Sequence, residues 1–227
     1  MIAGSRQGLG RALAEHYTDQ GNTVFGLSRG ESDLVRERYH HIRTDVTEET
    51  MVQQAFDRVA GIGLPLNVFI YSVGVKVTAY ALLTTPAQAA DMLRTNLLGA
   101  FLVTRHALRL MKRSGFGRVI YLSSIAVPLG SAGSVIYGAG KAGLEQMAFS
   151  LSREFRRDNI TFNSVGISIY PSEMVEALSE KALHETRAAL VKADNLELGE
   201  VVGAIDFFAS DAARQVTGQT IYFGGVR

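Results

Sequence analysis

Short apolar segments rich in β-branched residues alternate along the chain with longer segments in which apolar residues recur every three or four positions. The first pattern is typical of buried strands and the second of amphipathic helices. Strands are expected at residues 1–3, 23–27, 40–43, 67–72, 118–122, 161–165 and 220–223, and helices at 9–20, 47–60, 86–112, 134–157 and 199–209. This alternation predicts an α/β fold in which a doubly wound parallel sheet carries helices on both faces.

One region, residues 167–198, departs from the alternation because a helical pattern covers residues 174–192 within it. We expect this region to form a lid on the substrate side of the molecule. A chain of 227 residues is suited to one domain with a sizeable core. The prediction is therefore a single domain spanning 1–227, with 167–198 as its lid.

Composition narrows the possible functional classes. Apolar residues make up 47% of the chain and charged residues 20%, which is typical of a soluble globular protein. A net charge of +1 without a basic run gives no reason to expect nucleic acid or a membrane surface as a partner. No apolar stretch is long enough to span a membrane. A cytoplasmic enzyme is expected.

Neither cysteine nor histidine forms a pattern typical of a metal site. The chain has no cysteine, which excludes disulfides, thiolate nucleophiles and cysteine-ligated metals. His40 and His41 are adjacent and would point to opposite faces of a strand. The other histidines, His16, His106 and His184, stand alone in helical patterns. We expect no metal site.

A glycine-rich loop lies between the first expected strand and the first expected helix. Its sequence is Gly-Ser-Arg-Gln-Gly-Leu-Gly at residues 4–10. Glycines allow a tight turn and a close approach of the main chain to a pyrophosphate, which the helix N-terminus attracts. A glycine triplet alone is a weak signal, but this position at the start of an alternating chain favours a dinucleotide site of the Rossmann type.

The residues after the second strand indicate which dinucleotide would bind. An acidic residue about 20 positions past the glycines would select NAD, but the chain has Ser28 and Arg29 there and no carboxylate before Glu31. Arg6, within the loop, can reach the same region. Two guanidinium groups suit a 2′-phosphate, so NADP(H) is favoured over NAD(H). The alternative is that both arginines are solvated surface residues.

An aspartate follows the third expected strand. Asp45 would present its carboxylate to the adenine amino group, or it would belong to the start of a capped helix. Both interpretations can hold together.

Tyr137 and Lys141 lie four residues apart and on a helix would share one face. An unperturbed tyrosine has a pKa of about 10, and a nearby ammonium favours the phenolate, which brings that pKa toward the working pH of a proton-transfer group. Ser124, at the end of an apolar strand, could hold a carbonyl oxygen beside the tyrosine. A tyrosine and a lysine at this spacing, without further motifs, are more often ordinary surface residues. The two residues therefore have to be judged with the rest of the chain.

Together these features resemble the short-chain dehydrogenase/reductase family over essentially the whole chain. The resemblance rests on the GxxxGxG loop, on the YxxxK spacing and on Ser124 thirteen positions before Tyr137. Further motifs follow in the family's order: Asp45-Val46, Gly74, Asn96 in Asn-Leu-Leu-Gly-Ala-Phe, the Ser-Asp-Ala-Ala and Thr-Gly-Gln of residues 210–219, and the glycines at 224 and 225. Within the family, the chain is most similar to 3-oxoacyl-[acyl-carrier-protein] reductases.

The resemblance implies hydride transfer between a nicotinamide and a carbonyl or alcohol carbon. Tyr137 would exchange the proton and Ser124 would bind the reacting oxygen. Lys141 would depress the tyrosine pKa and hold the nicotinamide ribose. Asn96 would position a water that links Lys141 to solvent. The residues expected to contact NADP(H) are Gly4, Ser5, Arg6, Gly8, Leu9, Gly10, Ser28, Arg29, Asp45, Val46, Ser72, Gly74, Tyr137, Lys141, Tyr170 and Ser172.

Four positions depart from the family pattern. Residues 71–73, Tyr-Ser-Val, replace Asn-Asn-Ala, so the hydrogen bonds that brace the central sheet must come from elsewhere. Residues 167–168, Ile-Ser, replace Pro-Gly and would reshape the nicotinamide wall. Phe223 replaces an acid, and Ala3 replaces a threonine in a short first strand. These departures concern the cofactor geometry more than the catalytic set.

The candidate lining of the pocket is apolar and suits an acyl or alicyclic ketone better than a sugar: Val75, Ile125, Leu129, Ile136, Ile169, Met174 and Leu178. The first hypothesis is a reductase of 3-oxoacyl thioesters linked to coenzyme A or to an acyl carrier protein. The second is a ketoreductase or alcohol dehydrogenase for another small metabolite. The third is an NADP-binding regulator without turnover, against which the intact Asn-Ser-Tyr-Lys set counts.

Two expectations concern protein partners. An acidic carrier protein would need a basic rim beside the active-site mouth, although ordinary helix-end charge is the simpler explanation of the candidates, Lys112, Arg113, Arg153, Arg156 and Arg157. The helices at 86–112 and 134–157 carry more apolar residues than one buried face requires. This excess suggests an isologous subunit interface, and the family resemblance implies a homotetramer or homodimer.

Overall fold

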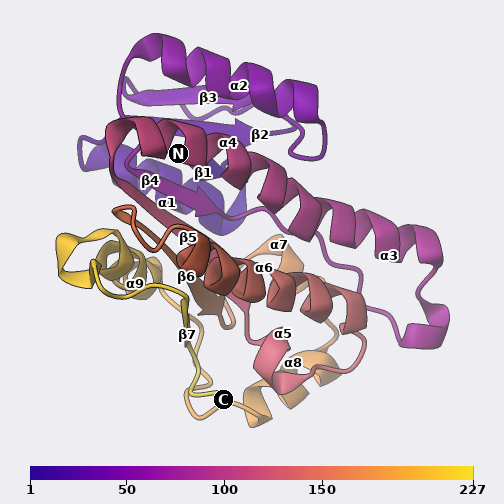
Figure 1. The fold of residues 1–227 in the computed structure, drawn as a ribbon. Coiled ribbons are helices and arrows are strands. Elements are labelled where there is room, and N and C mark those ends of the chain that lie inside the picture. Colours follow the sequence, from indigo (N-terminus) through magenta and orange to yellow (C-terminus); the bar gives the residue numbers. More distant parts are fainter. Residues whose placement is uncertain (227) are drawn as a thin grey trace.

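A computed structural model describes residues 1–226 of the chain. Its centre is a seven-stranded sheet in the order β3-β2-β1-β4-β5-β6-β7, with every neighbouring pair parallel (Figure 1). All seven predicted strands are present, and their ends differ by at most two residues from the predictions. They are β1 (Ile2–Ala3), β2 (Val24–Ser28), β3 (Tyr39–Arg43), β4 (Val68–Tyr71), β5 (Gly117–Ser124), β6 (Ile160–Ile167) and β7 (Gln219–Tyr222).

The order of the strands fixes where a ligand can bind. From β1 the chain builds β2 and β3 on one side of the sheet, then returns to place β4 on the other side of β1. Ile2 therefore pairs with Gly26 on β2 and with Ile70 on β4. In such a sheet the crevice at the carboxyl ends of the strands, where the order reverses, is the usual ligand site.

Helices cover both faces of the sheet, as predicted (Figure 1). Alternate side chains of each strand point to opposite faces, so Phe69 packs with the core beneath α2, α4 and α6, while Ile70 packs with the core beneath α1 and α9. The predicted helices correspond to α1 (Gly8–Asp19), α2 (Glu49–Ile62), α3 (Pro86–Leu93) with α4 (Gly99–Ser114), α6 (Val135–Glu154) and α9 (Leu198–Ala209). Shorter helical elements are η1 (Ala81–Leu83), α5 (Ala126–Leu129) and η3 (Asp211–Ala213).

The long helix predicted at 86–112 is not uniform. A π-helical turn, η2 (Arg94–Leu98), separates α3 from α4. Such turns carry one extra residue and often occur at functional sites. Here the turn places Asn96, which is fully buried, next to the loop that follows β4.

The lid region is less regular than predicted. Two short helices, α7 (Glu173–Glu176) and α8 (Glu180–Ala188), replace the single helix expected across 174–192. The break is at Ser179, whose hydroxyl accepts a hydrogen bond from the Ala182 N–H and so starts a new helix. Neither helix has a buried residue.

Over residues 1–226 the structure has no helix that is both long and apolar enough to cross a membrane. The same residues contain no group of three or more His, Cys, Asp or Glu side chains that could hold a metal ion.

Candidate active site

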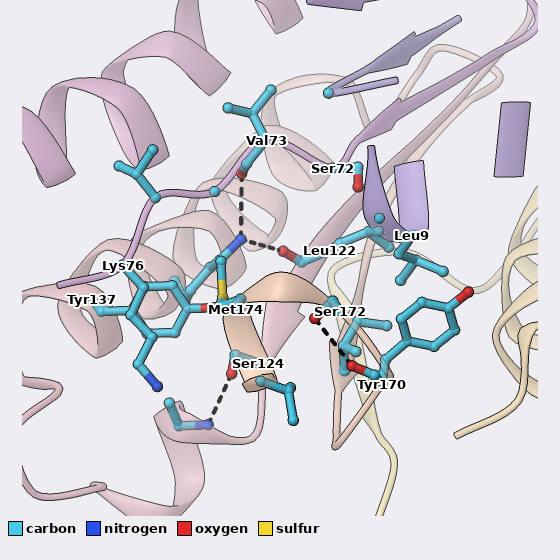
Figure 2. Close-up of a pocket in the computed structure, with 18 of the residues that line it drawn as sticks. Leu9, Ser72, Val73, Lys76, Leu122, Ser124, Tyr137, Tyr170, Ser172 and Met174 are labelled. Carbon is cyan, nitrogen blue, oxygen red and sulfur yellow. Dashed lines mark hydrogen bonds between the residues drawn. The ribbon is translucent and has the colours of Figure 1, made fainter. Parts of the chain in front are cut away.

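A cavity of about 710 Å³ opens at the carboxyl ends of the strands. Its lining combines the glycine-rich loop, the ends of β2, β4 and β5, the start of α6 and part of the 167–198 region (Figure 2). We call the part of the cavity that holds Ser124, Tyr137 and Lys141 the tyrosine end. The part that holds Arg6, Ser28, Arg29 and Asp45 is the arginine end.

The glycine-rich loop turns tightly between β1 and α1. Gly4 has a φ of 90°, a conformation that favours glycine. A Cβ on Gly10 would lie 2.1 Å from the Gly4 carbonyl oxygen, so only glycine allows the first turn of α1 to pack against this loop. The cap residue Gln7 makes no side-chain hydrogen bond to the helix, which leaves the N–H groups of the first turn free for an anion.

Ser5 does not line the cavity, contrary to the prediction that it contacts the cofactor. Its side chain is fully buried, and its hydroxyl lies 3.0 Å from the Tyr39 hydroxyl. Gly26 makes room for this pair, because a Cβ there would lie 2.4 Å from Ser5 Oγ. Ser5 therefore ties the glycine-rich loop to β3 instead of facing a ligand.

The arginine end is exposed and loosely held. Arg6 and Arg29 both line the cavity with exposed side chains, and within residues 1–226 neither forms an ion pair. Arg6 lies against Gly30, where a Cβ would be 2.9 Å from Arg6 Cδ. The Ser28 hydroxyl donates to the Gly30 carbonyl over 3.0 Å and also contacts a ring nitrogen of His41.

Asp45 holds the turn before α2 and also lines the cavity. Its Oδ1 accepts hydrogen bonds from the Thr47 N–H (2.9 Å) and the Thr47 hydroxyl (2.8 Å), which forms the turn before α2. This turn explains why α2 begins at Glu49 and not at Thr47. Asp45 and the buried Val46 both line the cavity.

Tyr137 and Lys141 lie on successive turns of α6 and face the cavity, as the YxxxK spacing predicts (Figure 2). Their exposed fractions are only 6% and 4%. The Lys141 ammonium donates to the Leu122 carbonyl over 2.8 Å and lies 3.5 Å from the Val73 carbonyl. It is thus held between the ends of β4 and β5.

The ionisation of these two residues differs from the sequence-based expectation. Burial raises the pKa of Tyr137, and its hydrogen bond with the Ser124 hydroxyl opposes this only in part. The expected depression by Lys141 is absent because the ammonium binds main-chain carbonyls and lies 5.9 Å from the centre of the phenol ring. Burial lowers the pKa of Lys141 itself to about 8.

Ser124 is the last residue of β5 and lines the cavity beside Tyr137. Its Oγ accepts a hydrogen bond from the Ala126 N–H over 3.1 Å, which leaves the hydroxyl proton available. The structure therefore brings Ser124, Tyr137 and Lys141 together on one wall.

Asn96 does not join them in the cavity lining. Its side-chain oxygen accepts from the Val75 N–H over 2.8 Å, and its amide donates to the Val75 carbonyl over 2.9 Å. Both ends of the side-chain amide are therefore occupied by one residue of the loop after β4. The side chain thereby holds this loop beside the site.

The departure at residues 71–73 is compensated locally. The Tyr71 hydroxyl donates to the Thr95 carbonyl over 2.6 Å, within the π-helical turn. Gly99 accommodates the phenol, since a Cβ there would lie 3.1 Å from its oxygen. Ser72 and Gly74 line the cavity as predicted.

The remaining lining is largely as expected. Six of the seven predicted apolar residues line the cavity; the exception is Ile136, which packs beside the small cluster of Met92, Ala126 and Tyr137. Tyr170 and Ser172 also line it, and the Ser172 hydroxyl donates to the Tyr170 carbonyl over 3.1 Å.

The basic residues considered for a rim are helix-end charges, the explanation favoured from the sequence. All five candidate residues lie at or just beyond the C-terminal ends of α4 and α6, and none lines the cavity. These helix ends lead into the starts of β5 and β6, at the edge of the sheet opposite the carboxyl ends. Lys112 instead faces Asp158, 3.8 Å away, as ordinary helix-end charge.

The cavity residues that were not predicted include Gln7 and Lys76. Gln7 donates to Glu173 over 3.1 Å and so links the glycine-rich loop to α7. Lys76 places its ammonium 5.3 Å from the centre of the Tyr137 ring. Its position two residues after Gly74, in the loop following a strand whose end faces the site, is the only sequence signal for it.

Comparisons with known proteins decide the family. The short-chain dehydrogenase model described as enoyl-(acyl carrier protein) reductase matches residues 3–225. The chain belongs to the short-chain dehydrogenase/reductase family. Among relatives in this family, 3-oxoacyl-[acyl-carrier-protein] reductase MabA of Mycobacterium avium is 30% identical over 99% of the chain and 88% of its own length.

Two further proteins are similar over nearly the whole chain. The 3-oxoacyl-[acyl-carrier-protein] reductase FabG of Aquifex aeolicus is 27% identical over 99% of the chain and 95% of its own length. A solved structure of a short-chain dehydrogenase from Leptospira borgpetersenii, with bound NAD+, superposes with a TM-score of 0.89 at 20% identity, covering 99% of this chain and 90% of that one. This last likeness concerns the fold alone.

Proposed function

We propose that the protein is an NADP(H)-dependent oxidoreductase that reduces the ketone of a 3-oxoacyl thioester, linked to coenzyme A or to a carrier protein. The observation that carries the proposal is the convergence of Ser124, Tyr137 and Lys141 on one buried wall of a cavity whose other side is a glycine-rich loop. Membership of the short-chain dehydrogenase/reductase family supports oxidoreductase chemistry.

The residues present fit a nicotinamide dinucleotide. The uncapped N-terminus of α1 and the close packing of Gly4 and Gly10 form a cradle suited to a pyrophosphate. Lys141, whose ammonium faces the cavity, would bind ribose hydroxyls. When bound, the reduced nicotinamide supplies a hydride to the ketone carbon.

The protein supplies the proton and the orientation. Tyr137 donates its phenolic proton to the ketone oxygen as charge develops there, and the Ser124 hydroxyl donates a hydrogen bond to the same oxygen. Burial raises the pKa of Tyr137, which keeps the phenol protonated near neutral pH. A protonated phenol is the form required for reduction.

NADP(H) is preferred over NAD(H) in this proposal because of the arginine end. Arg6 and Arg29 are free to pair with a 2′-phosphate, and no carboxylate lies between Ser28 and Glu31.

The substrate class rests on the relatives and on the lining. Both relatives described above are named for reduction of 3-oxoacyl groups on a carrier protein. The apolar lining from Val75, Leu129, Met174 and Leu178 would accommodate an acyl chain. We further propose that residues 167–198 act as a lid, and that exposed apolar residues on α4 and α6, such as Phe101 and Phe149, are covered in a homodimer or homotetramer.

The test is oxidation of NADPH, and separately of NADH, by the purified protein with acetoacetyl-coenzyme A. We expect turnover with NADPH and much less with NADH. Tight NADPH binding without turnover would support the cofactor assignment and exclude this substrate. Failure to bind either nucleotide would overturn the proposal in favour of a protein that kept the fold without the activity.

A further inference from the structure

Lys76 is a second ammonium at the tyrosine end. It lies half-buried in the cavity wall, in the loop after β4, beside the Tyr137 ring (Figure 2). The loop is fixed on both sides of it. Asn96 binds the main chain of Val75, and the Val77 N–H donates to Met92 Sδ over 3.4 Å. The place of the lysine is therefore set by the fold and not by a flexible segment.

The other charged residues that line the cavity have roles of their own or lie elsewhere. Asp45 accepts from Thr47, and Glu173 accepts from Gln7. Glu185 faces Lys181 across 3.8 Å, and the Lys141 ammonium binds main-chain carbonyls. The two remaining cations, Arg6 and Arg29, belong to the arginine end.

Lys76 is different because, within residues 1–226, its ammonium makes no hydrogen bond and no ion pair. Burial lowers its pKa, as expected where an ammonium loses water without gaining an acceptor. A half-buried ammonium in the cavity wall that has no partner within residues 1–226 is available to donate to an oxygen of a ligand.

The distance between Lys76 and Tyr137 limits what that ligand can be. The ammonium lies 5.3 Å from the centre of the phenol ring. Each donor reaches its acceptor over about 2.8 Å, so one small molecule in the cavity can contact both the phenol and the ammonium.

We propose that Lys76 donates a hydrogen bond to a second oxygen of the substrate, carried two carbons away from the ketone that Tyr137 protonates. The substrate class is then a 1,3-dicarbonyl compound, either a 3-oxoacyl thioester or a 3-oxo carboxylate. Lys76 distinguishes these compounds from simple ketones, and so determines specificity. The inference rests on the proposed function and adds a residue that reads the acyl carbonyl.

The experiment compares two substrates that differ only in the second oxygen. One is a 3-oxobutanoyl thioester, and the other is the 3-oxobutyl thioether, in which the thioester carbonyl is replaced by CH2. For Lys76→Met we expect kcat/KM to fall about 10- to 100-fold with the thioester, the usual effect of losing a hydrogen bond from a charged donor. With the thioether we expect a change of no more than about twofold. Free 3-oxobutanoate, tested in parallel, separates a carboxylate from a neutral carbonyl as the preferred acceptor.

Two variants serve as controls. Lys112→Met removes an ammonium from an exposed residue near the end of α4, outside the cavity lining, and should not change turnover of either substrate. Lys76→Arg keeps a cationic donor and should restore part of the preference for the thioester. Equal losses on thioester and thioether, or no loss on either, would overturn the role given to Lys76. Absence of thioester turnover by the unmodified protein would instead overturn the proposed function, and this inference with it.

Discussion

At the tyrosine end of the cavity Tyr137 and Lys141 are buried, whereas at the arginine end the Arg6 and Arg29 side chains are exposed and form no ion pair within residues 1–226. Tyr137 and Lys141 are 6% and 4% exposed, and Lys141 is held by the carbonyl of Leu122 at the end of β5. Arg6 and Arg29 extend from loops at the surface. The geometry of proton transfer is thus built into the core, while cofactor preference depends on side chains that can be exchanged without disturbing it.

The energetic consequences differ accordingly. Substitutions at the tyrosine end should affect both turnover and the pH dependence of stability, because buried ionisable groups are coupled to folding. Substitutions of Arg6 or Arg29 at the arginine end should affect the choice of dinucleotide and little else.

Tyr137→Phe removes the proton donor and keeps the ring. Turnover of the thioester should fall by about 10²- to 10⁴-fold, the usual contribution of a general acid, while the dissociation constant of NADPH, measured by fluorescence titration, should change by no more than about twofold. Undiminished activity would remove the phenol from the mechanism. A parallel loss of nucleotide binding would mean that the buried wall and the cofactor cradle are not independent.

Lys141→Met should change how stability depends on pH. The folded-state pKa of Lys141 is lowered to about 8 from the ordinary value of 10.5. Between these values the unfolded chain binds a proton that the folded chain does not, so stability falls as pH falls through this window. The free energy of unfolding should therefore fall by about 3 kcal/mol between pH 10.5 and pH 8 because of Lys141. In the variant this contribution should be absent.

Urea unfolding at several pH values would measure this difference. The missing side chain also leaves the Leu122 carbonyl without its donor, but that cost is the same at every pH. Only a pH-dependent difference between the stability curves of the unmodified protein and the variant reports the ionisation of Lys141. Parallel stability curves for the two proteins would show that the ammonium is not held in the unfavourable environment described here.

At the arginine end, Arg6→Ala and Arg29→Ala should each raise the KM for NADPH about tenfold, or about 1.4 kcal/mol, because each loses one ionic contact with the 2′-phosphate. The KM for NADH and the maximal rate should stay nearly unchanged, since NADH has no such phosphate. Arg58, which is exposed on α2 and absent from the lining of this cavity, provides the matched control as Arg58→Ala. Equal effects on both nucleotides would show that the arginines do not select between them.

Features set by a periodic pattern could be predicted from the sequence, whereas features set by contacts between distant segments could not. The seven strands and the convergence of Ser124, Tyr137 and Lys141 followed from periodic patterns, because strand ends and a four-residue helical spacing place side chains without knowledge of the packing. The π-helical turn did not follow from them. Its apolar pattern is that of one continuous helix, and the hydrogen bonds of Tyr71 and Asn96 that fix it come from other segments.

Predictions of side-chain direction were less secure than predictions of position. Ser5 lies in the expected loop but points into the core toward Tyr39, a partner 34 residues away. The depression of the Tyr137 pKa was expected from its distance in sequence to Lys141, whereas the structure directs the ammonium to carbonyls of β5 and the loop after β4. Lys76 was overlooked because its loop has no periodic pattern.

Transfer of deuterium from cofactor to product tests the central claim most directly. The protein would be supplied with NADPH carrying deuterium on the transferred position and with acetoacetyl-coenzyme A, and the 3-hydroxybutyryl product would be analysed by mass spectrometry. The account predicts one deuterium on C3 with the unmodified protein and hardly any labelled product with Tyr137→Phe. Product without deuterium on C3, or equal labelling by the variant, would contradict hydride transfer assisted by the buried tyrosine.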